Sequence, residues 1–132
     1  MTLEDFYNCV PSYIEIDYHM FKNTESLSAP FGEGFVVAID PTKVRSSADE
    51  KLKAAHEVGH CETGAFYSQG ENFLIRQRYE NKAERWAIKK LVPKDELEQA
   101  VKNGNTEVWQ LAEWFDVPDQ FIQKAISYYN NI

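Results

Sequence analysis

The feature that most restricts how this chain can fold is the segment His56-Glu57-Val58-Gly59-His60, which has the pattern H-E-x-x-H. Residues four positions apart on an α-helix lie on one face, with their β-carbons about 5–6 Å apart. Two imidazoles at this spacing can bind one metal ion, and the carboxylate one position along the helix then lies beside that ion. The pattern therefore predicts a helix in this part of the chain.

Signals for the start and the end of this helix flank the motif. Ser47 and Glu50 form the S-x-x-E pattern of a capping box, and Gly64 suits the left-handed residue that ends many helices. Gly59 lies inside the expected helix, where glycine costs about 1 kcal/mol relative to alanine. We therefore expect another segment of the chain to approach Gly59 closely.

The remaining chain shows a mixture of strand and helix patterns. The continuous apolar run at residues 35–39 fits a strand that is covered on both faces. We also expect a strand at residues 13–18, a loop at residues 22–34, and helices at residues 2–10, 76–91, 95–102, 106–115 and 118–129. These elements predict an α+β fold of zincin-like form, in which a small sheet lies beside the helix of the H-E-x-x-H motif and further helices pack around them.

Length and composition limit the number of domains and the compartment. A chain of 132 residues is expected to form a single domain, with a C-terminal helical part at residues 94–132 packed on the rest. No secretory signal pattern opens the chain, and no apolar run reaches the roughly 20 residues of a membrane span. We expect a cytoplasmic protein in which Cys9 and Cys61 remain free thiols.

The charge balance argues against a nucleic-acid-binding protein. The chain has 21 acidic and 14 basic residues, a formal charge of -7, which opposes contact with phosphates. Residues 111–118 loosely resemble a DNA-binding helix-turn-helix, but Lys124 is the only basic residue from position 103 onward. We therefore expect the C-terminal helices to pack against the metal-binding part or to grip a substrate protein.

The chemistry that the motif suggests is zinc-dependent hydrolysis. A catalytic zinc ion has three protein ligands and a bound water whose pKa falls to about 7, and a neighbouring carboxylate can accept the proton of that water. His56 and His60 are the expected ligands, and Glu57 is the expected base. The alternative is a pair of histidines with no metal-binding role.

The third ligand remains open at this stage. Glu80 and Glu84 share a face of the helix expected at residues 76–91, and either carboxylate would complete a His₂Glu site. His19 is a weaker candidate because it lies far upstream. Cys61 directly follows His60, so it points about 100° away on the helix, and we expect it to be a packed thiol.

Tyrosines near the motif offer a further possible role. Tyr67 and Tyr79 could each donate a hydrogen bond to a tetrahedral intermediate. Because the chain contains seven tyrosines, we interpret both of them as core residues.

The residues described so far resemble the ImmA/IrrE family of metallopeptidases, from residue 35 to about residue 129. The similarity consists of the strand at residues 35–40, the helix with residues 55–60, and residues 79–87 running on to residues 91–93. In that family the third zinc ligand is the glutamate of an E-x-x-A-x-x-[FW]-A pattern. Here the pattern begins at Glu80, so the resemblance implies that Glu80 joins His56 and His60 on Zn²⁺.

The resemblance also implies a biological role. Members of this family cleave transcriptional repressors, commonly helix-turn-helix proteins of phages and mobile elements. A zinc endopeptidase that cleaves such a repressor is therefore the expected function, with a protein substrate and without direct contact to nucleic acid or membrane. The alternative is a non-catalytic zinc-containing domain that binds and sequesters a repressor.

Overall fold

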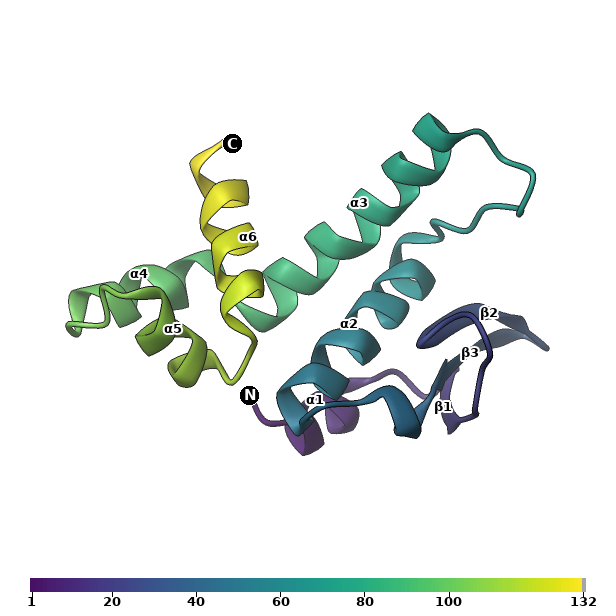
Figure 1. Cartoon of the computed structure of the whole chain (residues 1–132), viewed down its shortest axis with the longest axis horizontal. Coiled ribbons are helices and arrows are strands. Elements are labelled where there is room, and N and C mark those ends of the chain that lie inside the picture. Colours follow the sequence, from purple (N-terminus) through teal and green to yellow (C-terminus); the bar gives the residue numbers. More distant parts are fainter. Residues whose placement is uncertain (132) are drawn as a thin grey trace.

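The computed structural model describes residues 1–131 and shows an α+β fold (Figure 1). Within these residues it has six α-helices and a sheet of three strands. In chain order the elements are α1 Leu3–Cys9, β1 Ile14–Tyr18, β2 Ser26–Phe31, β3 Gly34–Ile39, a short 3₁₀ helix at Pro41–Lys43, α2 Ser47–Thr63, α3 Phe73–Leu91, α4 Lys94–Lys102, α5 Val108–Phe115 and α6 Asp119–Asn130. The predicted α+β class is thus confirmed, and residue 132 of the expected C-terminal part lies outside the described residues.

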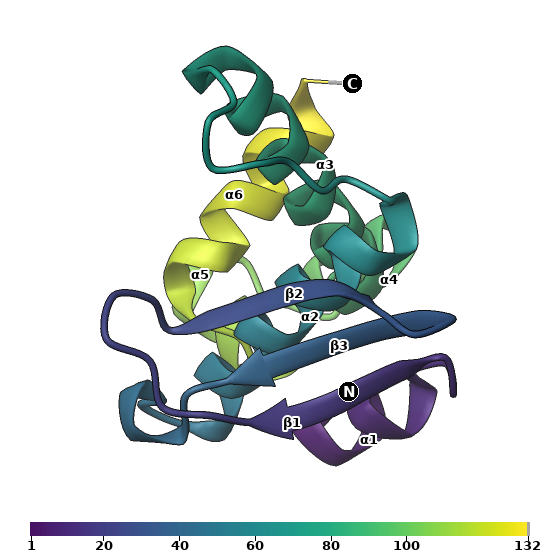
Figure 2. The same cartoon turned by 90° about the vertical axis from the view of Figure 1, so that its right-hand side faces the viewer.

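The sheet is mixed and has the strand order β1-β3-β2. The central strand β3 pairs parallel with β1 and antiparallel with β2, so β2 forms one edge (Figure 2). Gly32, with a φ of 59°, and Glu33 form the turn that joins β2 to β3. A positive φ of this kind favours glycine, which explains the tight hairpin.

Strand β2 corrects the expected loop at residues 22–34. Its serines and its proline resemble loop residues, and it lacks the apolar alternation of a typical half-buried strand. Pro30 is tolerated because β2 is an edge strand, where a missing N–H breaks no hydrogen bond. Its partner in the register is Phe35, whose N–H points away from β2 and donates to the Tyr13 carbonyl (2.8 Å). Hairpin pairing with β3 therefore determines this strand, although its own residues show no strand pattern.

Helix α2 lies against the sheet, and α3 packs alongside α2 and runs in the opposite direction (Figure 1). At the contact between them, a β-carbon built on Gly59 would lie only 2.6 Å from the carbonyl oxygen of Ala83 in α3. The predicted close approach at Gly59 is confirmed, and glycine is the residue that permits it. This contact places the middle of α3 directly over the H-E-x-x-H segment.

Side-chain caps and a left-handed glycine define the ends of several helices. Thr2 and Asp5 form a reciprocal capping box on α1, and Gly64 ends α2 in the left-handed conformation with a φ of 67°. The predicted capping box of Ser47 and Glu50 is wrong, because α2 is capped one residue earlier. The Ser46 side chain accepts a hydrogen bond from the Asp49 N–H (3.1 Å). Helix α3 begins three residues earlier than residue 76, because the Asn72 side chain caps it by accepting from Ile75 N–H (3.0 Å).

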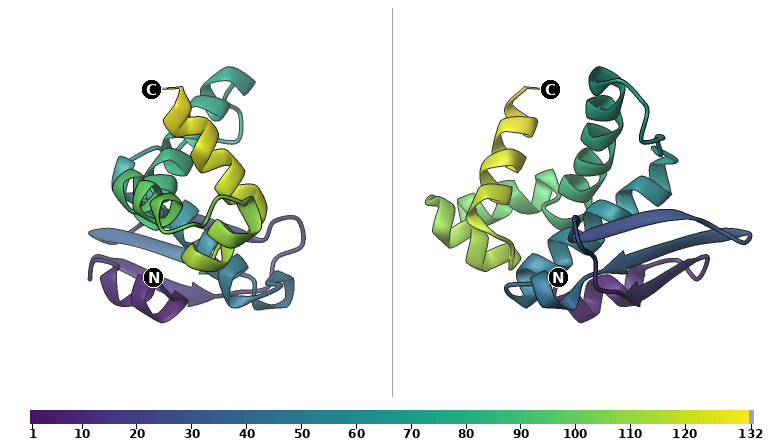
Figure 3. Two further views of the ribbon diagram at one scale, coloured as in Figure 1. Left: turned by 90° about the vertical axis from the view of Figure 1, so that its left-hand side faces the viewer. Right: turned by 45° about the vertical axis from the view of Figure 1, so that its right-hand side comes forward.

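Helices α4, α5 and α6 lie together on one side of the molecule (Figure 3). They share one continuous cluster of buried residues with the sheet and α2. The fully buried Lys51 of α2 donates hydrogen bonds to the carbonyls of Met1 (2.6 Å) and Phe115 (3.0 Å). The Tyr129 hydroxyl of α6 donates to the Val92 carbonyl after α3 (2.7 Å). Among residues 1–131, no helix is both long and apolar enough to cross a membrane.

Candidate metal centre

Three side chains with metal-binding atoms meet where α3 crosses α2. His56 Nε2 lies 2.7 Å from a Glu80 carboxylate oxygen, and His60 Nε2 lies 3.2 Å from the same carboxylate. The histidine rings are 4.9 Å apart between centroids, and the possible ligand atoms of all three residues lie within 4.8 Å of one another. The structure thus brings together the three residues that the sequence suggested as ligands.

The other sequence candidates lie elsewhere. The Glu84 carboxylate pairs with Lys124 of α6 at 2.9 Å and is not part of the cluster. His19 follows β1 and packs edge-on against Phe21, with ring centroids 4.9 Å apart. Cys61 is buried and is a free thiol, as expected, and burial raises its pKa to about 12. Of the two glutamates left open by the sequence, the geometry therefore favours Glu80.

The types of donor atom in this cluster suit a zinc ion. Ligand atoms about 2.0–2.2 Å from zinc in a tetrahedral arrangement lie about 3.3–3.6 Å apart. The observed contacts of 2.7 and 3.2 Å are shorter, because the carboxylate here makes hydrogen bonds with the imidazoles directly. Two imidazole nitrogens and one carboxylate, with all their possible ligand atoms within 4.8 Å of one another, are the donor set of a His₂Glu zinc site.

Contacts behind the possible ligands fix their orientation. His60 Nδ1 lies 2.6 Å from the Ala65 carbonyl oxygen, so that nitrogen carries the proton and Nε2 faces the cluster. The left-handed Gly64 turns the chain so that this carbonyl can reach the ring. Such contacts set the tautomer of metal-binding histidines in proteins.

Tyr67, in the loop between α2 and α3, corrects the core interpretation. Its side chain is partly exposed, and its hydroxyl donates to Glu80 Oε1 at 2.7 Å. The neighbouring carboxylate raises the pKa of Tyr67 to about 12, so the hydroxyl stays protonated and remains a donor. Its ring stacks on Tyr79, which is half-buried on α3, with 6.3 Å between centroids. No sequence pattern distinguishes Tyr67 from the other tyrosines.

The cluster favours a charged carboxylate. Hydrogen bonds from His56, His60 and Tyr67 hold the pKa of Glu80 far below its usual range. Burial alone would lower the pKa of His60, but its contacts with Glu80 and the Ala65 carbonyl outweigh this and raise it. The three residues therefore attract positive charge to the point where they meet.

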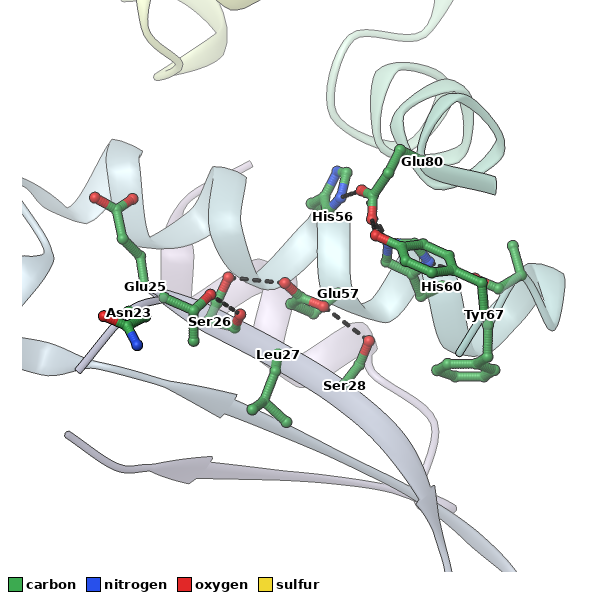
Figure 4. A pocket seen from close by; sticks show the side chains of 13 residues that line it. Asn23, Glu25, Ser26, Leu27, Ser28, His56, Glu57, His60, Tyr67 and Glu80 are labelled. Atoms are coloured by element: carbon green, nitrogen blue, oxygen red, sulfur yellow. Dashed lines mark hydrogen bonds and ion pairs between the residues drawn. The ribbon is translucent and has the colours of Figure 1, made fainter. Parts of the chain in front are cut away.

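Glu57 lies beside the cluster and faces the sheet. Its side chain is 7% exposed, and its two carboxylate oxygens accept separate hydrogen bonds from serines of β2 (Figure 4). The Ser26 hydroxyl donates to Oε2 at 2.8 Å, and the Ser28 hydroxyl donates to Oε1 at 2.7 Å. Both serines fell within the expected loop, so their role was missed. A strand prediction for β2 would have placed them on one face by their spacing of two residues.

An open cavity of about 580 Å³ gives access to this site. Its walls come from β2, from α2, from the loop after α2 and from Glu80 of α3. His56, Glu57 and His60 all line it, so solvent and a ligand can reach both the possible metal ligands and the carboxylate.

Comparison of the chain with protein families, with curated proteins and with solved structures finds no significant match.

Proposed function

We propose that the protein is a zinc-dependent endopeptidase in which His56, His60 and Glu80 bind the metal and Glu57 is the base. The observation that carries the proposal is a three-ligand cluster with a separate carboxylate beside it, both lining one open cavity. A structural zinc site closes the ion with four side chains, whereas a catalytic site leaves one position for water. The small sheet beside the H-E-x-x-H helix also supports a zincin-like fold.

Different residues of the chain have different roles in the proposed peptide hydrolysis. A bound zinc ion supplies a Lewis acid that activates water and polarises the substrate carbonyl. Glu57 accepts the proton of the attacking water and later transfers it to the leaving amine. Tyr67 keeps Glu80 in place by donating its only hydroxyl proton to that carboxylate at 2.7 Å.

The outer edge of the sheet supports an extended polypeptide as the substrate. In an antiparallel pair, the N–H and C=O groups of successive residues point alternately toward the partner strand and away from it. The Asp40 N–H donates to the Glu25 carbonyl (2.9 Å), so the main-chain groups of Ser26 and Ser28 point away from β3. Residues 23–28 line the cavity. A substrate strand added at this edge would therefore cross the metal centre.

The substrate that we propose is a transcriptional repressor, commonly of the helix-turn-helix class. This choice rests on the sequence resemblance to the ImmA/IrrE family. The net charge of -7 is compatible with a protein partner and opposes direct binding to DNA.

The decisive substitution is Glu57→Gln, which removes the base but keeps the shape of the side chain. We expect zinc content and melting temperature close to those of the original protein, and loss of repressor cleavage by a factor of at least about 100. Zinc is measured by elemental analysis, and cleavage is followed by electrophoresis with the candidate repressor. Proteolysis that persists in Glu57→Gln would contradict the role of Glu57.

A repressor that is released from DNA equally well by the original protein and by Glu57→Gln would support the alternative, a domain that sequesters its partner without cutting it. Absence of cleavage products in both reactions would strengthen that conclusion.

A further inference from the structure

We infer that Ser26 and Ser28 are positioning residues for Glu57, which hold its carboxylate in the orientation needed to accept a proton from water. This inference rests on the proposed function and extends it to two residues of the edge strand. Neither serine belongs to the H-E-x-x-H motif, and both act through Glu57 rather than on the substrate.

The geometry of the contacts fixes the carboxylate in two ways. Ser28 donates to one oxygen at 2.7 Å and Ser26 donates to the other at 2.8 Å, so rotation of the carboxylate would break both bonds. The two hydroxyls come from positions i and i+2 of one strand, so they point to the same face of the sheet. The strand thus forms a two-point support for a side chain that belongs to a helix.

The support leaves Glu57 able to act as a base. An ionised carboxylate has about four lone-pair positions, two on each oxygen. Each serine occupies one position on its oxygen, so each oxygen keeps a second position for a proton from the cavity. Glu57 is only 7% exposed but lines the cavity, so a water in the cavity can reach one of these remaining positions.

The same two residues also face the proposed substrate. Their main-chain groups point to the outer edge of β2, while their hydroxyls reach Glu57 on the helix side (Figure 4). A peptide paired with this edge would be in register with the strand that orients the base. Strand β2 thereby fixes the scissile bond and the proton acceptor relative to each other.

The test uses binding of acetohydroxamate to the zinc-loaded full chain, because this probe needs no knowledge of the substrate. A hydroxamate binds zinc through its two oxygens and gives its proton to a nearby carboxylate. Affinity is measured by calorimetry for the original protein, for Ser26→Ala/Ser28→Ala, for Glu57→Gln, and for the triple variant. Ser127→Ala, at an exposed position on α6, is the matched control.

We expect Ser26→Ala/Ser28→Ala to weaken acetohydroxamate about tenfold, which corresponds to ~1.4 kcal/mol. The same pair of substitutions should have no further effect in the Glu57→Gln background, because the serines act through that carboxylate. Ser26→Thr/Ser28→Thr keeps both hydroxyls and should retain the original affinity. Zinc content is checked in every variant, so a folding defect is recognised separately.

Equal weakening with and without Glu57, or no weakening at all, would overturn the positioning role and leave the proposed function intact. Weakening that threonine does not rescue would overturn it as well. If the original protein binds no zinc, or if Glu57→Gln leaves the affinity for acetohydroxamate unchanged, the proposed function itself fails and the inference fails with it.

Discussion

At the residue scale, Glu80 is the side chain on which the cluster depends. Its carboxylate contacts both histidines and also accepts a hydrogen bond from Tyr67. Three polar partners around one carboxylate from another helix give it a defined orientation before any ion is bound. Preorganisation of this kind reduces the entropy that metal binding must overcome.

Glu80→Ala and Glu84→Ala form a matched pair that tests this assignment. Loss of a residue that only orients a ligand lowers metal affinity by up to about 100-fold. Glu80→Ala removes a proposed ligand itself, so it should lower zinc affinity by more than this. Glu84 contacts Lys124 instead, so Glu84→Ala should keep zinc affinity within about threefold, as expected for an exposed ion pair. Competition with a chromogenic chelator measures both. The reverse order of effects would show that the third ligand has been misassigned.

The sequence could identify the two histidines and Glu57, because their spacing on one helix has a direct geometric meaning. Spacing alone narrowed the third candidate to Glu80 or Glu84, because both lie on one face of α3, and the family resemblance then favoured Glu80. Glu84 forms an ion pair with Lys124, which lies 40 residues further along the chain on another helix. Contacts of this range depend on how helices pack, and local patterns do not encode that.

At the scale of secondary-structure elements, the crossing of α2 and α3 determines the distance between the histidines and Glu80. Gly59 lies one residue before His60, and its neighbour Ala83 lies one turn after Glu80. The contact between them involves a backbone carbonyl, which cannot rotate away as a side chain could. The crossing is thus set by the glycine itself.

Gly59→Ala should therefore destabilise the protein although alanine favours helices by about 1 kcal/mol. The new methyl group would push α3 away from α2, and we expect the free energy of unfolding to fall by about 1–3 kcal/mol. Zinc affinity should fall too, because Glu80 moves with α3. Urea denaturation and zinc titration measure the two effects.

Gly70→Ala is the control for this change, because a β-carbon at Gly70 meets no atom within 4 Å among the residues that the structure describes. It should leave both stability and zinc affinity nearly unchanged. An equally small effect of Gly59→Ala would show that the helices can separate without cost.

Strand β2 is the element that the sequence did not reveal. Strand β3 was predictable because its residues form an unbroken apolar run, whereas β2 has serines at the positions that face Glu57. Their hydroxyls bind Glu57 instead of packing in the core, so local propensity and final structure disagree there. Such conflicts are expected at functional sites, where side chains serve a ligand rather than the core.

At the scale of the whole molecule, Lys51 connects three distant parts of the chain. Its ammonium group contacts the carbonyls of Met1 and Phe115 and lies 3.7 Å from the Asp116 carboxylate. It lies in α2 little more than one turn before His56. Helix α2, which carries the two candidate histidines, is therefore held to both the N-terminal segment and the C-terminal helices by a buried charge.

Lys51→Ala should lower the free energy of unfolding by about 2–4 kcal/mol. The substitution leaves a cavity and removes the hydrogen-bond donor from two carbonyls. Chemical denaturation measures the loss, and Lys102→Ala, on the exposed face of α4, should change stability by less than about 0.5 kcal/mol. If the two variants were equally stable, the buried lysine would contribute nothing to holding the helices together.

The contact between His60 and the carbonyl of Ala65 has a consequence for how this site can vary. Because the acceptor is a main-chain oxygen, no codon change at position 65 can delete it, whereas a carboxylate in the same role could be lost by one mutation. Substitution of the side chain at position 65 therefore does not change which nitrogen of His60 faces Glu80. This contact depends instead on the path of the backbone, above all at Gly64. Any other residue at position 64 would have to adopt an unfavourable left-handed conformation.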